Sequence, residues 1–183
     1  PTQAGRRIAD FVDRQLSNWY VRLSRRRFWS KGNAADSSSN KDKYAAYQTL
    51  FRCLRTVAQL MAPIAPFYAD RLYRDLAAGQ AAPAADSVHL SIMPAYNADE
   101  QDAALEQRMD YAQRLASLVL SLRKRENLRV RQPLQKVLVP SLGADFQTQI
   151  DRIKDILLTE VNVKELAFIT DTDGLVTKKI KPN

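Results

Sequence analysis

Residues 18–29 carry the side chains in this chain that are best suited to bind nucleic acid. The run Asn-Trp-Tyr-Val-Arg-Leu-Ser-Arg-Arg-Arg-Phe-Trp holds four arginines and four large aromatic residues within twelve positions. Guanidinium groups hold phosphates through paired hydrogen bonds, and aromatic rings stack on bases and on other planar groups. A globular core gains little from arginines that two tryptophans bracket. The run therefore predicts a surface that contacts nucleic acid.

A long helix is predicted over residues 8–29, with this run at its end. Apolar residues recur at three- and four-residue steps, which is typical of one buried helical face: Ile8, Val12, Leu16, Trp19 and Leu23. A second stripe on the same helix has the spacing i, i+3, i+4 and i+7 and is the predicted binding face: Arg22, Arg25, Arg26 and Trp29. The alternative interpretation of this stripe is a solvated helix face, or one that faces another domain.

Arg27 and Lys31 complete the first basic cluster. Arg27 falls near the edge of the apolar face, where an arginine more often pairs with a carboxylate of a neighbouring helix than with a ligand. Lys31 opens a small, polar and Ser-rich segment, residues 30–42, which is predicted to be a loop. Lys31 is the last residue of the cluster and is a further candidate nucleic-acid contact.

Two further basic clusters follow along the chain. The second supplies candidate contacts to a nucleic-acid backbone: Arg123, Lys124, Arg129 and Arg131. Its alternative interpretation is electrostatic, because cations at the C-terminus of a helix are favoured by the helix dipole alone. The third consists of Lys178, Lys179 and Lys181, which would also serve to protect the edge of a sheet.

The overall charge agrees with an acidic partner. The 183 residues contain 28 Lys and Arg against 20 Asp and Glu, with a formal net charge of +8. Such a balance suits RNA, DNA or an anionic membrane and does not choose among them. No apolar run reaches the length of about eighteen residues that a membrane span needs, and no signal peptide opens the chain. We therefore expect a cytoplasmic protein without membrane contact. We also expect a piece of a longer chain, since both ends look cut.

No catalytic arrangement emerges from the sequence. Cys53 is the only cysteine and His89 the only histidine, which excludes an internal disulfide and a cysteine-built zinc site. The chain has no Gly-rich phosphate loop and no Ser/His/Asp combination. We therefore expect no catalytic residue, no metal and no cofactor in this stretch.

Helical periodicity continues through the first two thirds of the chain. Three more helices are predicted, at residues 44–61, 66–78 and 100–125, and the alternation of Val88, Leu90 and Ile92 predicts an extended strip between the last two. The aromatic residues Tyr44 and Tyr47, like Trp19, are expected in the core rather than at a ligand.

The period changes near residue 127. Strands are predicted at residues 133–140 and 163–169, a helix at residues 145–158 between them, and a hairpin that ends at residue 180. The predicted fold is mainly α: an antiparallel helical bundle, residues 1–126, followed by a small α+β unit, residues 127–183.

Five stretches resemble one family. They are residues 18–29, Asp-Lys-Tyr-Ala-Ala-Tyr-Gln-Thr-Leu at 42–50, Leu-Met-Ala-Pro-Ile-Ala-Pro-Phe-Tyr-Ala-Asp at 60–70, Asn-Leu-Arg-Val-Arg-Gln-Pro-Leu at 127–134, and Val-Asn-Val-Lys-Glu-Leu at 161–166. Together they look like the anticodon-binding helical domain of class I isoleucyl-tRNA synthetases, over nearly the whole chain. Valyl, leucyl and methionyl enzymes share this kind of bundle, and the equivalent domain of one of them is an alternative.

The resemblance implies a binding role within a larger ligase. The parent enzyme would join isoleucine to its tRNA with ATP and Mg²⁺, and its catalytic and editing domains would be further parts of the same chain. The signatures His-Ile-Gly-His and Lys-Met-Ser-Lys-Ser are absent here, so this stretch alone should be inactive. It would act as a monomer that docks the anticodon stem-loop of an isoleucine-accepting tRNA.

A second hypothesis needs no RNA. The chain would then be a non-catalytic helical interaction module that binds an acidic protein partner. The stripe that ends at Trp29 argues against this hypothesis, because a generic acidic partner does not require an aromatic residue among the arginines.

Overall fold

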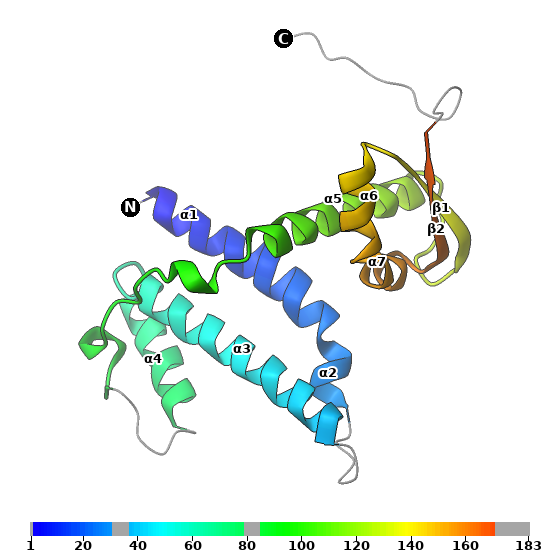
Figure 1. Cartoon of the computed structure of the whole chain (residues 1–183). Helices are drawn as coiled ribbons and strands as arrows, with labels where there is room; N and C mark the ends of the chain where they lie inside the picture. The colour runs from blue at the N-terminus through cyan, green and yellow to red at the C-terminus, as the bar shows by residue number, and fades with distance from the viewer. Residues whose placement is uncertain (1, 31–36, 79–84, 171–183) are drawn as a thin grey trace. The chain divides into compact units, whose positions relative to one another are not determined.

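The computed structural model describes residues 2–30, 37–78 and 85–170, and it is mainly helical with one two-stranded sheet, as the sequence predicted (Figure 1). The chain divides into two compact units, residues 1–98 and 99–183. The sequence placed a domain boundary later, after residue 126. The boundary between independently folding domains stays a prediction.

The N-terminal unit begins with one continuous helical run. It consists of α1 (Thr2–Asp10), the π-helical segment η1 (Phe11–Val21) and, after a turn at Ser24, α2 (Arg25–Trp29) (Figure 1). The wider turns of a π-helix bring residues five apart together, and Asn18 Nδ2 donates to Asp13 Oδ1 at 2.8 Å within η1. The run continues through Ser24, because the Phe28 amide donates to the Ser24 carbonyl at 3.0 Å.

Helix α3 (Ser37–Met61) is the centre of this unit. It contacts the helical run on one side and α4 (Pro66–Ala77) on the other. Pro66 occupies the first turn of α4, as predicted, where a missing amide proton is tolerated. Small side chains let the helices approach closely, since Ala46, Ala58 and Ala69 are fully buried.

The segment after α4 differs from its prediction. Val88 is 3% exposed and packs with Ala58 and Tyr73, but residues Val88–Leu90 form a single 3₁₀ turn (η2) rather than an extended strip. Leu90 and Ile92 are 73% and 89% exposed. The alternating pattern was therefore misleading here, because only one of its three apolar residues is buried.

The C-terminal unit is built on α5 (Ala103–Arg125), preceded by a short 3₁₀ turn, η3 (Ala98–Glu100). Asp102 caps α5 by accepting a hydrogen bond from the Leu105 amide at 2.9 Å. The buried face of α5 carries Ala112, Ala116 and Arg123, whereas Leu105 and Leu122 are exposed.

Two parallel strands complete this unit. They are β1 (Leu134–Pro140) and β2 (Val163–Ile169), with Val137 opposite Leu166 in the register. Parallel strands need a crossover, and the predicted single helix at 145–158 is in fact two helices, α6 (Ala144–Asp151) and α7 (Lys154–Val161). Ile150 in α6, Ile153 at the break and Leu157 in α7 are all buried. The predicted hairpin at 175–180 lies outside the described residues.

Candidate nucleic-acid interface

The predicted stripe is on the protein surface. Arg22, Arg25 and Arg26 are exposed, and Trp29 has 77% of its surface in contact with solvent. The stripe begins after the π-helical segment ends at Val21, so its side chains keep nearly the α-helical spacing from which it was predicted. A tryptophan so exposed, beside arginines, offers a stacking surface and positive charge on one short helix.

The other face of the same helix is fixed to α3. Phe28 is buried, with its ring 5.0 Å from that of Tyr47 and 6.4 Å from that of Tyr20. The hydroxyl group of Tyr20 donates to the carbonyl of Ala46 at 2.9 Å. These contacts set the rotation of α2, and they thereby decide that Trp29 and its neighbouring arginines face solvent.

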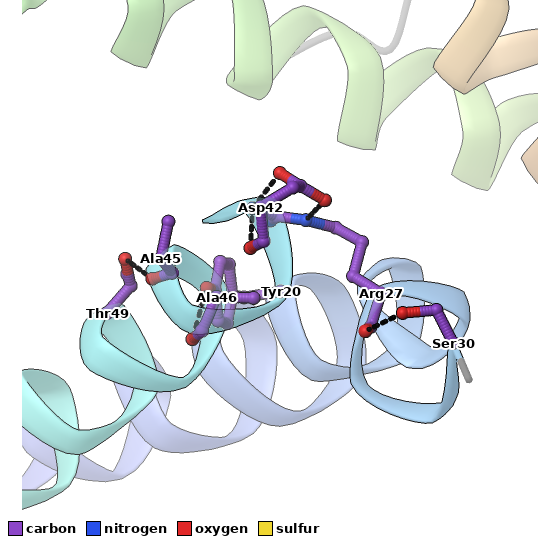
Figure 2. A network of polar contacts seen from close by, with 7 residues as sticks. All are labelled: Tyr20, Arg27, Ser30, Asp42, Ala45, Ala46 and Thr49. Carbon is purple, nitrogen blue, oxygen red and sulfur yellow. Dashed lines mark hydrogen bonds and ion pairs between the residues drawn. The ribbon is translucent and has the colours of Figure 1, made fainter. Parts of the chain in front are cut away.

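Arg27 makes the carboxylate pair that the sequence predicted. Its Nε donates to Asp42 Oδ2 at 2.8 Å and its Nη2 to Asp42 Oδ1 at 2.7 Å, which is a bidentate fork between α2 and α3 (Figure 2). The Arg27 hydrogen bond holds the pKa of Asp42 below its ordinary value, and the Asp42 hydrogen bond raises the pKa of Arg27. Arg27 is thus a structural residue rather than a ligand contact.

The remaining aromatic residues divide between core and surface. Trp19 is 9% exposed and Leu16 is 5% exposed, so the prediction of a buried stripe is confirmed for both. Tyr47 packs on Phe28 but is 46% exposed, and Tyr44 is 70% exposed. The expectation that Tyr44 belongs to the core is therefore wrong. Tyr44 lies on α3 two residues after Asp42 and presents an exposed aromatic side chain there.

Arg123 also departs from its prediction. It was expected to contact a nucleic-acid backbone, but its side chain is buried, with 2% of the residue exposed, and its guanidinium group donates to main-chain carbonyls of its own unit. A phosphate has no access to a group buried in this way. We therefore remove Arg123 from the candidate contacts.

Lys124, Arg129 and Arg131 are all exposed in the C-terminal unit. Lys124 lies in the last turn of α5, and the two arginines lie on the loop between α5 and β1. Arg125, also in the last turn of α5, pairs with Glu126 at 2.9 Å. The second cluster is thus a basic loop next to a helix C-terminus. The stripe belongs to the N-terminal unit and this loop to the C-terminal unit.

Lys31 and the cluster of Lys178, Lys179 and Lys181 lie outside the described residues, and their roles stay predictions. Among the residues that the structure describes, no group of three or more His, Cys, Asp or Glu side chains is placed to hold a metal ion. No helix in that part of the chain is long and apolar enough to cross a membrane. Burial raises the pKa of the Cys53 thiol, which makes it a poor nucleophile.

A groove of about 400 Å³ lies elsewhere on the N-terminal unit. It runs between the first helical run and the end of α3, and its apolar lining includes Ile8, Val12, Met61 and Ile64. Phe67, close by in the sequence at the start of α4, is 91% exposed. This face is apolar, whereas the stripe on α2 is basic, so the unit has two surfaces of different character.

Comparisons with known proteins identify relatives. The family described as the anticodon-binding domain of tRNA ligase matches residues 2–138. The isoleucine-tRNA ligase of Porphyromonas gingivalis is 50% identical over 183 residues, all of this chain and 15% of that protein. That of Cytophaga hutchinsonii is 52% identical over 183 residues, again all of this chain and 16% of that protein. That of Bacteroides fragilis is 49% identical over 181 residues, 99% of this chain and 15% of that protein.

The chain therefore spans only about one sixth of the length of these curated relatives. In them, the matching segment belongs to a much longer polypeptide.

Proposed function

The chain belongs to the family of anticodon-binding domains of tRNA ligases, and we propose that it docks the anticodon stem-loop of an isoleucine-accepting tRNA. The observation that carries this proposal is the exposed stripe of Arg25, Arg26 and Trp29 on a helix whose opposite face is fixed to α3. Sequence-specific recognition of RNA targets single-stranded loops, whose unstacked bases lie on aromatic or guanidinium planes. An anticodon loop is such a target.

Each part of the proposed interface has a separate task. Arg22, Arg25 and Arg26 neutralise phosphates and bring the RNA to the surface, while Trp29 stacks on an unpaired base. Lys124, Arg129 and Arg131 supply backbone contacts in the C-terminal unit. None of these steps is chemical. The chain contributes orientation, because a tRNA held by its anticodon arm presents its acceptor end to an active site elsewhere in the protein.

The whole protein would be an isoleucine-tRNA ligase, the name that the relatives carry. It would act in the cytoplasm as a monomer. It would bind ATP and Mg²⁺ outside this stretch, since neither His-Ile-Gly-His nor Lys-Met-Ser-Lys-Ser lies within it. We propose that the catalytic and editing domains are further parts of that polypeptide. The apolar groove is a surface on which another part of the protein would pack.

The affinity for tRNA as a function of salt concentration tests the docking role. Each phosphate contact that is lost lowers the slope of log affinity against log salt by about 0.7 to 0.9. We expect the Arg25→Ala/Arg26→Ala variant to bind isoleucine tRNA more weakly and with a smaller slope than the unmodified chain.

The matched control removes two exposed arginines from other places on the same unit. Arg14→Ala/Arg71→Ala changes the net charge equally, and both residues are in i,i+4 ion pairs on their own helices. An equal loss of slope in the two variants would leave only nonspecific attraction between the chain and RNA. Full retention of affinity by Arg25→Ala/Arg26→Ala would assign the stripe to a protein contact instead, as the hypothesis of an acidic partner requires.

A further inference from the structure

A buried arginine in the last turn of α5 holds the loop between α5 and β1. Arg123 Nη1 donates to the carbonyls of Arg129 at 3.1 Å and Gln132 at 3.0 Å, and its Nη2 donates to the carbonyl of Asn162 at 2.9 Å. The Nε of Arg123 has no hydrogen-bond acceptor among the described residues. A buried cation with an incomplete set of partners is costly, and an apolar side chain of similar length would avoid that cost. Stability alone is therefore a weak reason for an arginine at this position.

Asn162, at the end of α7, holds the same loop. It ends α7 in the left-handed conformation, with φ of 51°. Its Nδ2 donates to the carbonyls of Val130 at 2.8 Å and Arg131 at 3.2 Å. Its own carbonyl accepts from Arg123 and from the Leu134 amide at 3.1 Å. Asn162 thus links the loop, the buried arginine and the first residue of β1.

Together the two residues engage four successive carbonyl groups. The carbonyls of residues 129–132 each accept a hydrogen bond from Arg123 or Asn162. Carbonyl oxygens carry partial negative charge and would repel a phosphate if they faced it. Here they are turned toward the protein, while the side chains of Arg129 and Arg131 are exposed.

We infer that Arg123 and Asn162 are positioning residues that shape loop 129–132 into a surface for an RNA phosphate backbone. They act through Arg129 and Arg131, which make the contacts, and they do not touch RNA themselves. The inference rests on the proposed tRNA binding. A loop ordered before binding loses less conformational entropy when the RNA docks, so the clamp affects affinity as well as local order.

Asn162→Gly in the full chain is the most direct test. Glycine adopts a positive φ readily and keeps the main-chain carbonyl, so the variant removes only the two bonds from Nδ2. Asn127→Gly is the matched control, because Asn127 also has a positive φ, 56°, and lies at the start of the same loop. Arg123→Met is a second variant that removes the guanidinium group, and circular dichroism and urea denaturation establish that each variant is folded.

The measurement is the salt dependence of affinity for an isoleucine tRNA transcript. We expect Asn162→Gly to lower the slope by as much as Arg129→Ala/Arg131→Ala does, about 1.4 to 1.8 for two contacts, and Asn127→Gly to leave it unchanged. Adding Asn162→Gly to Arg129→Ala/Arg131→Ala should cause no further loss, because both changes act on the same contacts. Hydrogen exchange of the amides in 128–132 should be faster in Asn162→Gly.

Three results would overturn the inference. The first is a folded Asn162→Gly variant with the slope of the unmodified chain. The second is a further loss of slope when it is added to Arg129→Ala/Arg131→Ala, and the third is an unchanged slope in Arg129→Ala/Arg131→Ala itself. If the unmodified chain bound tRNA without any salt dependence, the proposed function would fail before the clamp was tested, so the two failures are distinguishable.

Discussion

Asp70 on α4 accepts a hydrogen bond from the hydroxyl group of Ser87, with 2.6 Å between the two oxygens. The same Oδ1 accepts from the Val88 amide at 3.1 Å, and Oδ2 pairs with Arg74 Nε at 2.7 Å. One carboxylate thereby fixes the segment after α4 to that helix and keeps Val88 in the small core of the N-terminal unit.

This arrangement predicts a pH dependence of stability. The hydrogen bond from Ser87, followed by those from Val88 and Arg74, holds the pKa of Asp70 below its ordinary value of 3.8. A carboxyl whose pKa is lowered in the folded state contributes stability that is fully present above the pKa of the unfolded chain and is lost as pH falls through the folded pKa. Asp70→Asn should therefore unfold more easily than the unmodified chain at pH 7, and the difference should shrink below pH 3.8.

Urea denaturation between pH 7 and pH 2.5, or as low as the protein stays folded, measures this difference. Asp75→Asn serves as the control, because it removes an exposed carboxylate from the same helix, where Asp75 pairs with Arg71 in an i,i+4 ion pair. A difference between Asp70→Asn and the unmodified chain that stayed constant at low pH would contradict the role given to the Asp70 carboxylate.

Replacement of the two tryptophans should separate stability from binding. Trp19 is buried, so Trp19→Ala should lower the free energy of unfolding by about 3–5 kcal/mol. Trp29 is exposed, and Trp29→Ala should change that free energy by no more than about 0.5 kcal/mol. Loss of one stacked base should nevertheless weaken tRNA binding by about 1–3 kcal/mol.

Thermal denaturation and tRNA titration of both variants check this prediction. Trp29→Phe is the matched control, since it keeps an aromatic face and should retain part of the affinity. A Trp29→Ala variant that bound tRNA like the unmodified chain would remove Trp29 from the interface.

Arg27→Lys should lower stability without reducing the salt slope. Lysine keeps the positive charge but cannot form the two parallel bonds to Asp42, and the loss of stability should be small because the pair is partly in contact with solvent. Arg25→Lys, two positions earlier, should leave the unfolding free energy unchanged. Urea denaturation of the two variants tests the assignment of Arg27 to structure, which an equal effect of both substitutions would contradict.

Local periodicity explains which parts of the site could be predicted from the sequence. A helical wheel gives the angular position of each side chain, so the exposure of Arg25 and Trp29, the burial of Trp19 and the carboxylate partner of Arg27 all followed from spacing along one helix. The strands β1 and β2 were predicted from the loss of helical periodicity after residue 126.

Tertiary contacts explain what could not be predicted. Arg123 donates a hydrogen bond to Asn162, 39 residues further along the chain, and no spacing near Arg123 indicates that partner. Arg123 was expected to be exposed, and Tyr44 to be buried, from the position of each within its own helix. In each case the neighbouring element, and not the periodicity of the helix itself, decided the environment.

The buried Arg123 also predicts where the C-terminal unit can be cut. Its three hydrogen bonds join the end of α5 to the loop and to the residue after α7, and α5 packs against α6 and α7. A fragment of residues 99–183 should therefore fold cooperatively, whereas a fragment of residues 127–183 loses both the apolar face of α5 and the guanidinium group. We expect the shorter fragment to be largely unfolded.

Far-UV circular dichroism and urea denaturation of the two fragments measure this difference. Arg123→Met in the longer fragment separates the two losses, because it removes the hydrogen bonds and keeps the apolar face of α5. If residues 127–183 unfolded cooperatively on their own, the boundary predicted after residue 126 would be a true domain boundary. An unfolded shorter fragment beside a cooperative longer one would instead place α5 in the C-terminal domain, together with the loop that its Arg123 holds.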